Sequence, residues 1–468
     1  MNYITRIVAT IGPSSCKNKI INKFLNSGIS LVRLNGSHNT LEWHGKTIKD
    51  IRKINKKIPI LFDIPGEKIR IDNQKEDIRF NKRDKIIFSK KLIKTTKNVI
   101  LNNTKFYDNI KLNMKFSADD GNLVFKVTEI KKNYVEVLAL TDGSLSSKKG
   151  INIPNLFSGK ENIKITAKQK KYLNFAKKMN VEYVGFSFVE SDTQINKIKK
   201  FLNSKNIKII SKIENLNGLK NLSKIIDVSD AIMIDRGDLV AETSIYKLPY
   251  NQKKIIKEVN SKNKPIIVAT EMMHSMIEND KPSKSEVLDV ANAIFDGATC
   301  TMLSGETAQG KYPLKSISEM IKIHSSIKNQ KRKYLKNYKS LSIQQLTANA
   351  LESLCDSKNI HKLIIITKSG YAATEIAFKN INQKMLVVTD NIHTSRYLSL
   401  YPRIKTIKYI KKFTRKDLRY VEKIIKYLFK IKEIDKDENV VIVSAAYPKN
   451  GVKFNSIQTH NVGNIVNN

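Results

Sequence analysis

The fold of this chain is decided by two sequences, I-I-S-K-I-E-N at 209–215 and M-I-D-R-G-D at 233–238. In each, an apolar run rich in β-branched residues stops abruptly in charged residues, which is typical of a buried strand at its end. Lys212, Glu214 and Asp238 are therefore expected where two neighbouring strands stop. A surface salt bridge is the alternative for any single Lys–Glu pair, but charges set directly on buried runs are costly unless paired or metal-bound. An ammonium group beside two carboxylates also suits magnesium-assisted chemistry at phosphate.

The same alternation of short apolar runs and longer helix-like segments recurs along the chain, as in βα units around a parallel sheet. We predict eight strands, at 6–11, 30–35, 59–64, 183–188, 207–213, 231–235, 265–270 and 299–304. Eight such strands suggest an α/β fold, a closed (β/α)8 TIM barrel whose active site lies at the carboxyl ends of the strands. Polar residues fall at or just beyond those ends on five strands: Arg33, Asn35, Asp63, Lys212, Glu214, Asp238 and Thr270.

A chain of 468 residues is too long for one hydrophobic core, and the strand series is interrupted after the third strand. Residues 72–154 alternate apolar and polar positions, with turns at Asp120-Gly121 and Asp142-Gly143, and predict an inserted β-barrel lid domain. The TIM barrel would then be built from residues 1–71 and 155–335. After a lysine-rich connection near 331–339, a C-terminal α/β domain is predicted at 342–468, with strands at 362–367, 384–389 and 439–444.

The formal net charge is +41, from 84 Lys and Arg against 43 Asp and Glu. Dense positive charge attracts nucleic acid, but here the lysines are spread over the whole chain instead of forming one stripe. They accompany abundant Ile and Asn, the combination that an A/T-rich genome encodes. We therefore expect no specific nucleic-acid partner, although the charge should steer anionic substrates toward the protein.

The three cysteines are widely spaced and fit neither a metal-binding template nor a disulfide framework. No run of 18 or more apolar residues occurs, so no transmembrane helix and no membrane partner are expected. The first strand begins too close to Met1 to leave room for a signal or transit peptide. These features together predict a cytoplasmic protein.

With these elements placed, the chain resembles pyruvate kinase over nearly its full length. Besides the two opening sequences, the matching motifs stand in order at 6–15 (R-I-V-A-T-I-G-P-S-S), 32–38 (V-R-L-N-G-S-H), 62–70 (F-D-I-P-G-E-K-I-R), 147–154 (S-K-K-G-I-N-I-P), 265–273 (P-I-I-V-A-T-E-M-M) and 301–313 (T-M-L-S-G-E-T-A-Q-G-K-Y-P). The resemblance implies transfer of the phosphoryl group of phosphoenolpyruvate to ADP, giving pyruvate and ATP in the last step of glycolysis. It also implies Mg²⁺ or Mn²⁺ as cofactor and a homotetramer.

The resemblance implies a role for each residue at the strand ends. Glu214 and Asp238 would hold the Mg²⁺, and Lys212 would stabilise the phosphoryl group in flight. Arg33 would clamp the phosphate, and Thr270 lies on the face where the enolate of pyruvate is protonated.

Other contacts of the substrates are implied in the same way. The backbone N–H groups of Gly237 and Asp238 would bind the substrate carboxylate. In the S-K-K-G sequence Lys149 is favoured over Lys148 as a contact of the ADP phosphates. The residues expected on the nucleotide side are Arg70, Lys149, Asn35 and His38, with Asp120 reaching in from the lid.

A monovalent-cation site is implied at Asn35, Ser37, Asp63 and the carbonyl of Ile64. Many family members carry Glu five residues after that aspartate and need K⁺, whereas this chain carries Lys68. The resemblance therefore predicts that the Lys68 ammonium takes the place of the ion and that K⁺ is not required.

The chain departs from the family pattern at several positions. Gly36 stands where an aromatic residue is usual, and Val240 where glycine is usual. Asp235 and Glu271 add negative charge near the expected metal site, which would either tighten Mg²⁺ binding or repel an anionic substrate. The alternatives are therefore another barrel enzyme acting on phosphoenolpyruvate or pyruvate, a catalytically weakened homologue, or a binding protein that adheres to nucleic acid. The stretch 367–373, T-K-S-G-Y-A-A, matches a loop that holds an effector phosphate in regulated members.

Overall fold

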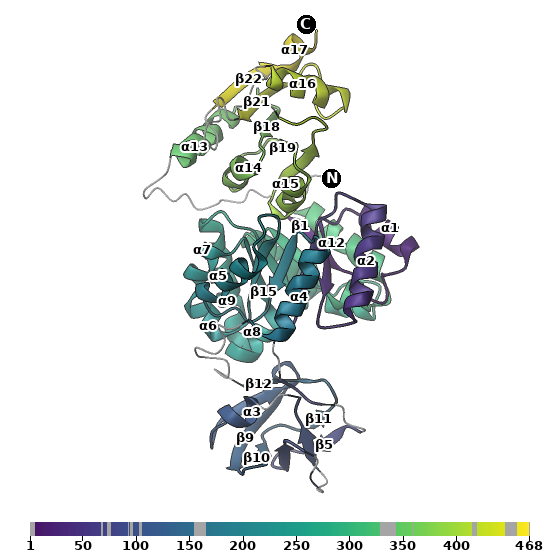
Figure 1. The fold of residues 1–468 in the computed structure, drawn as a ribbon, viewed down its shortest axis with the longest axis vertical. Coiled ribbons are helices and arrows are strands. Elements are labelled where there is room, and N and C mark those ends of the chain that lie inside the picture. The colour runs from purple at the N-terminus through teal and green to yellow at the C-terminus, as the bar shows by residue number, and fades with distance from the viewer. Residues whose placement is uncertain are drawn as a thin grey trace.

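The computed structural model describes residues 5–66, 69–72, 76–91, 93, 97–102, 105–153, 165–327, 343–357, 359–413, 419–444 and 456–467. Three bodies lie along the long axis of the molecule, with a helix-wrapped barrel in the middle (Figure 1). A small β body lies at one end of the barrel, and a C-terminal α/β body lies at the other (Figure 1).

The central body is a closed barrel of eight parallel strands, in the order β1-β17-β16-β15-β14-β13-β3-β2. Parallel strands covered on both faces read as continuous apolar runs, which is why the sequence located all eight. The strands are β1 (Arg6–Thr10), β2 (Leu31–Asn35), β3 (Ile60–Ile64), β13 (Tyr183–Phe186), β14 (Lys208–Ile213), β15 (Ala231–Asp235), β16 (Ile266–Ala269) and β17 (Cys300–Leu303). Several predicted strands extend one or two residues too far. At 183–188 and 265–270 the reason is the left-handed backbone of Phe188 (φ 53°) and Thr270 (φ 67°), which a strand does not accommodate.

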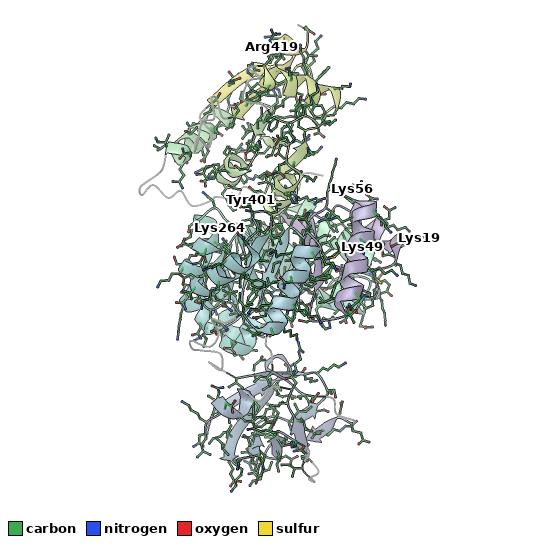
Figure 2. All side chains as sticks on the ribbon, viewed as in Figure 1. Lys19, Lys49, Lys56, Lys264, Tyr401 and Arg419 are labelled. Atoms are coloured by element: carbon green, nitrogen blue, oxygen red, sulfur yellow. The ribbon has the colours of Figure 1, made fainter. Side chains whose placement is uncertain are left out.

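Helices surround the barrel: α1 (Asn18–Asn26), α2 (Leu41–Ile54), α4 (Ala167–Lys178), α5 (Asp192–Leu202), α6 (Leu216–Lys220), α7 (Leu222–Val228), α8 (Arg236–Thr243), α9 (Leu248–Ser261), α10 (Lys284–Phe295), α11 (Gly305–Ala308) and α12 (Pro313–Ser326). Capping boxes fix the start of α4 at Thr166 and of α10 at Ser283. Lysines such as Lys19 and Lys49 lie on the outer faces of these helices and point away from the core (Figure 2). No helix among the described residues is long and apolar enough to cross a membrane.

The β body consists of strands that follow β3 and precede β13. It contains β4 (Ile69–Arg70), β5 (Ile78–Phe80), β6 (Lys85–Ser89), β7 (Asn98–Ile100), the short α3 (Lys105–Asn109), β8 (Lys115–Ala118), β9 (Leu123–Ile130), β10 (Tyr134–Ala139), β11 (Gly143–Leu145) and β12 (Gly150–Asn152). A seven-stranded sheet runs β4-β12-β8-β9-β10-β6-β7, and the bridge between Ile71 and Leu101 brings its two edges together. The aromatic rings of Phe88, Phe116 and Phe125 pack in its centre. The turn at Asp120-Gly121 joins paired strands β8 and β9, whereas Asp142-Gly143 leads to β11, which pairs with β5.

The C-terminal body has a five-stranded sheet in the order β20-β19-β18-β21-β22, in which only β22 is antiparallel. Its elements are α13 (Ile343–Cys355), β18 (Lys362–Ile366), α14 (Tyr371–Ile376), β19 (Lys384–Thr389), α15 (Ile392–Tyr397), β20 (Ile404–Lys408), α16 (Tyr420–Lys430), β21 (Asn439–Ser444), β22 (Ser456–Asn461) and α17 (Val462–Val466). The sequence located β18, β19 and β21 but missed β20 and β22, the two edge strands. β20 buries only Ile404 and Ile407, and no residue of β22 is fully buried, so neither strand has the continuous apolar run that marks the others.

The C-terminal body docks on the amino ends of the barrel strands, the end opposite the β body (Figure 1). Leu400 joins the hydrophobic cluster formed by the inward-facing residues of the barrel, and Tyr401 lies at the junction (Figure 2). Around this contact Arg6 donates to the carbonyl oxygen of Tyr401 at 3.0 Å, and Tyr183 donates to that of Tyr397. The amino end of the barrel is therefore closed by protein, and its carboxyl end is the one left for a site.

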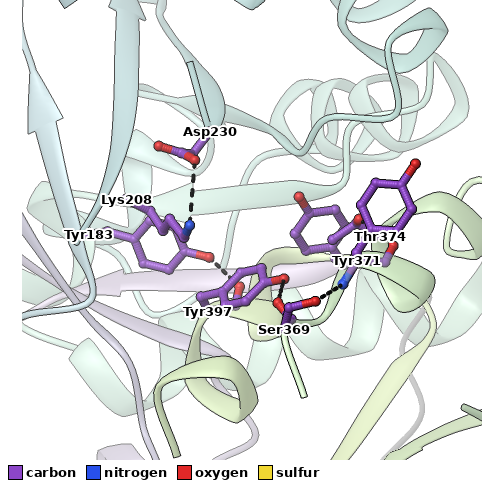
Figure 3. A pocket seen from close by; sticks show the side chains of 8 residues that line it. Tyr183, Lys208, Asp230, Ser369, Tyr371, Thr374 and Tyr397 are labelled. Atoms are coloured by element: carbon purple, nitrogen blue, oxygen red, sulfur yellow. Dashed lines mark hydrogen bonds and ion pairs between the residues drawn. The ribbon is translucent and has the colours of Figure 1, made fainter. Parts of the chain in front are cut away.

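A cavity of about 420 Å³ lies between the two bodies at this junction (Figure 3). Tyr183, Lys208 and Asp230 line it from the barrel, and Ser369 and Tyr371 line it from the C-terminal body. The last two belong to the T-K-S-G-Y-A-A stretch singled out in the sequence, so one side of that loop faces the barrel.

Candidate active site

The carboxyl end of β14 carries a buried lysine surrounded by acidic groups. Lys212 Nζ lies 2.8 Å from Glu214 Oε1, 3.1 Å from Asp235 Oδ2 and 3.6 Å from Asp63 Oδ2. Lys212 Nζ also donates a hydrogen bond to Ser187 Oγ at 3.2 Å. Lys212 is 5% exposed, so its charge is held by side chains instead of water. The structure thus brings together residues that the sequence placed on separate strands.

Burial and charge act in opposite directions on Lys212. Burial would lower the pKa of its ammonium, but the carboxylates of Asp63, Glu214 and Asp235 outweigh it and raise that pKa well above the usual value. Lys212 is therefore a permanent cation. It is suited to binding an anion and unsuited to acting as a base.

Three carboxylates converge beside this lysine. One oxygen from each of Glu214, Asp235 and Asp238 lies within 4.8 Å of the other two. Glu214 is completely buried, and burial together with the charges of Asp235 and Asp238 raises its pKa to about 8, against the opposing effect of Lys212. Glu214 Oε2 accepts from the backbone N–H of Phe188, whereas Oε1 is paired with the Lys212 ammonium at 2.8 Å, a contact that leaves one of its two lone pairs unused. Hard carboxylate oxygens with an open position of this kind fit Mg²⁺ or Mn²⁺.

Arg33 at the end of β2 is oriented by its neighbours. Its Nε and Nη2 donate to Asp63 Oδ2 at 3.0 and 2.7 Å, and its Nη1 donates to Thr10 Oγ1 at 3.2 Å. Arg33 and Asp63 are 6% and 2% exposed. The guanidinium is thereby fixed in the same buried corner as Lys212.

Thr270 and the start of α8 form one hydrogen-bonded unit. The hydroxyl oxygen of Thr270 accepts from the backbone N–H groups of Arg236 at 2.9 Å and Gly237 at 3.1 Å, and its proton goes to the carbonyl of Ala269. The positive φ of Thr270 turns the chain so that the hydroxyl reaches these groups. A Cβ added to Gly237 would meet nothing within 4 Å, so glycine there is not required by packing. The space above Gly237 is open to a ligand.

The residues expected on the nucleotide side lie around the border between the barrel and the β body. Burial lowers the pKa of His38, and the nearby charges of Arg70 and Arg33 lower it further. Arg70 Nη1 donates to the carbonyl of Lys148 at 2.8 Å, which ties β4 to the S-K-K-G turn. Lys149 Nζ instead lies 2.7 Å from Asp119 Oδ2.

The tip of the β body touches α8. In the turn Asp119–Gly121, a Cβ built on Gly121 would lie 4.0 Å from the Cα of Ala241. The side chain of Asp120 falls outside what the structure describes. The tip nevertheless lies beside the helix that carries Asp238, so the β body covers the side of the site formed by α8.

The space beside Gly36 is filled by another aromatic side chain. A Cβ added to Gly36 would lie 2.7 Å from the Asp63 carbonyl oxygen and 3.1 Å from the ring of Tyr172. Tyr172 comes from α4 and stacks on Phe62, with ring centroids 6.0 Å apart. The aromatic group that the sequence lacks at 36 is thus supplied by a distant helix.

The expected cation site is only partly described. Asn35 Oδ1 accepts from the backbone N–H of Ser37 at 3.1 Å, and the carbonyl of Ile64 accepts from Ser187 Oγ at 3.1 Å. Asp63 Oδ1 is buried without a hydrogen bond among the described residues. Lys68, on which the K⁺ prediction depends, and Glu67 lie outside the described residues.

Sequence reasoning missed two features of the site. It placed Asp235 near the metal but not as a direct partner of Lys212, and it did not identify Ser187 at all. The position of Asp235 at the last residue of an apolar run was the available signal for the first. Glu271, the other extra acid, is exposed and does not belong to the three-carboxylate group.

Known proteins match this chain along almost all of its length. The family model described as the pyruvate kinase barrel domain matches residues 3–317, and that of the pyruvate kinase alpha/beta domain matches residues 345–460. Pyruvate kinase of Thermotoga maritima is 32% identical over 460 residues, covering 96% of this chain and 97% of the relative. That of Thermococcus litoralis is 40% identical over 335 residues, 69% of each chain, and that of Bacillus licheniformis is 33% identical over 416 residues, 85% and 70%.

Proposed function

Because this chain belongs to the pyruvate kinase family, we infer that it transfers the phosphoryl group of phosphoenolpyruvate to ADP, producing pyruvate and ATP. One observation supports this inference above the others. Lys212 is held as a buried cation among carboxylates, one of which also pairs with Arg33, at the carboxyl end of a TIM barrel. That arrangement suits phosphoryl transfer, in which catalysis is mainly positioning and charge stabilisation.

We propose that Lys212 and Arg33 bind the phosphoryl group from its two sides. Lys212 supplies a compact charge, whereas Arg33 supplies a planar fork already oriented by Asp63 and Thr10. Both cations are buried, so their attraction to a phosphoryl oxygen is screened less than it would be in water. Neither side chain needs to reorganise far to meet the substrate.

Glu214 and Asp238 are the residues proposed to hold Mg²⁺ or Mn²⁺, the cofactors that the family generally uses. When bound, such an ion supplies positive charge to the phosphate and carboxylate oxygens of the substrate. The substrate carboxylate would lie over Gly237, where a side chain is absent and the space is open. Thr270 now accepts from the N–H of Gly237, so we propose that this hydroxyl holds the N–H until the carboxylate replaces it.

The nucleotide is proposed to bind between the β body and the barrel. Arg70 and Lys149 would meet the ADP phosphates, with His38 and Asn35 on the barrel side. Lys149 is paired with Asp119, and we propose that Asp119 releases Lys149 when the ADP phosphate binds.

We further propose that Lys68 makes K⁺ unnecessary and that the enzyme is a cytoplasmic homotetramer. The chain is proposed to divide into domains at residues 72, 155 and 342. These statements rest on the family resemblance and on the sequence.

An assay of ADP-dependent pyruvate formation tests the proposed function. Purified protein with phosphoenolpyruvate, ADP and Mg²⁺ should form pyruvate and ATP in equal amounts, and omission of ADP should stop both. Formation of pyruvate without ADP would indicate another phosphoenolpyruvate-consuming barrel enzyme. Absence of turnover, together with salt-sensitive binding to mixed-sequence DNA, would favour a protein retained for binding.

A further inference from the structure

The carboxylate of Asp235 distinguishes this site, because the family resemblance supplies only two metal-binding carboxylates, Glu214 and Asp238. Asp235 is the last residue of β15, is 7% exposed and directs its Oδ2 to within 3.1 Å of Lys212 Nζ. One of its oxygens lies within 4.8 Å of an oxygen from each of the other two carboxylates. It is therefore part of the same buried cluster.

We propose that Asp235 is a third carboxylate ligand of the divalent cation. This inference rests on the proposed function, which places the cation at Glu214 and Asp238, and goes beyond it.

Geometry supports the proposal. Mg²⁺ binds oxygen at about 2.1 Å, so two ligands of one ion lie at most about 4.2 Å apart. The three carboxylate oxygens lie within 4.8 Å of one another, so changes of a few tenths of an ångström would bring all three into one shell. A fully buried oxygen of the cluster, Glu214 Oε1, is paired with Lys212 Nζ at 2.8 Å. A carboxylate oxygen has two lone pairs, so this ion pair leaves one for a metal ion.

The balance of charge supports it as well. The corner holds two cations, Lys212 and Arg33, and four carboxylates: Asp63, Glu214, Asp235 and Asp238. When all are ionised the formal charge is −2, which one divalent cation cancels. Without Asp235 the charge would be −1, and a bound divalent cation would leave the corner positive. Buried charge is costly unless it is compensated, so the third carboxylate matches the charge of the ion.

The alternative is that Asp235 serves only as a counter-ion that positions Lys212. The two roles predict different metal affinities. A ligand contributes directly to binding of the ion, and its loss should weaken that binding by at least the tenfold or so typical of supporting residues. A counter-ion that does not touch the metal acts on it only through its charge. Its loss should therefore weaken metal binding to the same extent in Asp235→Ala and Asp235→Asn, and equal weakening in the two variants would reject the third ligand.

Binding of Mn²⁺ in the absence of substrates decides between them. The free Mn²⁺ is measured by electron paramagnetic resonance in titrations of the intact protein, its Asp235→Ala and Asp235→Asn variants, and Asp230→Asn as the matched control. Asp230 immediately precedes β15 at its amino end, so the control removes the same charge from the far end of that strand. We expect the dissociation constant to rise about tenfold or more in Asp235→Ala, less in Asp235→Asn, whose amide oxygen still coordinates, and not at all in the control.

An unchanged or lower dissociation constant in Asp235→Ala would overturn the proposal. If Asp235→Ala does not fold, the isosteric Asp235→Asn decides: affinity equal to that of the unmodified protein overturns it. Glu214→Gln separates this inference from the proposed function. If Glu214→Gln loses Mn²⁺ binding and the Asp235 variants keep it unchanged, the two-carboxylate site is supported and the third ligand is rejected. Retention of full binding in Glu214→Gln would reject the metal site itself.

Discussion

The two ends of the barrel hold buried ions in opposite proportions. At the carboxyl end one cation, Lys212, faces the three carboxylates of Asp63, Glu214 and Asp235. At the amino end one carboxylate, Glu182, faces two guanidinium groups, Arg52 at 2.5 Å and Arg396 at 2.7 Å. Glu182 also accepts from the backbone N–H of Ile60 at 2.9 Å.

The difference lies in what remains unsatisfied. Both oxygens of Glu182 are used, and its two partners come from the barrel and from the C-terminal body, so this cluster joins two bodies into one structure. In the carboxyl-end cluster, Asp63 Oδ1 accepts no hydrogen bond among the described residues, and Lys212 is shared among three carboxylates. A buried ion cluster that is complete within the protein serves stability, whereas one left with excess charge is prepared for a ligand.

The largest effect is expected from breaking the ion cluster of Glu182 with Arg52 and Arg396, which is complete within the protein. Glu182→Ala removes the carboxylate shared by buried Arg396 and half-buried Arg52, and loss of one member of a buried ion pair costs about 3–5 kcal/mol. We expect the urea midpoint of unfolding to fall accordingly. The control is Glu278→Ala, which removes an exposed carboxylate paired with Lys311 and should leave the midpoint unchanged. Equal midpoints for the two variants would contradict the structural role assigned to Glu182.

The next largest effect is expected from removing Lys212, the cation that faces Asp63, Glu214 and Asp235 at the carboxyl end of the barrel. Lys212→Met keeps the length of the side chain but removes the charge that faces the phosphoryl group, so kcat should fall by on the order of 10²–10³ or more. Lys208→Met is the matched control, because Lys208 begins the same strand at the amino end. Steady-state assay of pyruvate formation measures both. Activity of Lys212→Met within a few-fold of that of Lys208→Met would show that Lys212 is a structural ion like Glu182.

A smaller effect concerns the packing behind the incomplete cluster. Gly36→Ala places a Cβ 2.7 Å from the carbonyl oxygen of Asp63, a backbone atom that cannot yield easily, so overpacking should cost about 1–3 kcal/mol of unfolding free energy. Gly237→Ala is the contrast, since its Cβ meets nothing within 4 Å. Thermal unfolding of both variants should show a loss only at Gly36. Equal losses in the two variants would contradict the close approach of the Asp63 carbonyl to Gly36.

The sequence could predict the barrel because its strands are buried on both faces and carry the signal in their own composition. The same reasoning placed Lys212, Glu214 and Asp238 at one end, since parallel strands share an end. It could not predict the cluster at Glu182, because Arg396 lies 214 residues away and nothing local marks the pair. Tyr172 beside Gly36 was missed for the same reason, as a compensating contact between elements far apart in the chain.

The smallest expected effect is that of K⁺ on the activity of the unmodified protein, which should be close to zero. It tests whether the charge at the carboxyl end of the barrel is compensated without an added ion. If Lys68 supplies the charge of the monovalent cation, activity measured in a buffer free of Na⁺ and K⁺ should change little when K⁺ is added. The variant Lys68→Glu restores the acid typical of K⁺-dependent members, so its activity should become K⁺-dependent, because the carboxylates then need an external cation. Choline chloride at equal ionic strength controls for screening by salt. The contrary result would be a large activation of the unmodified protein by K⁺ and an equal activation of Lys68→Glu. It would mean that Asp63 Oδ1 is left open for the ion itself.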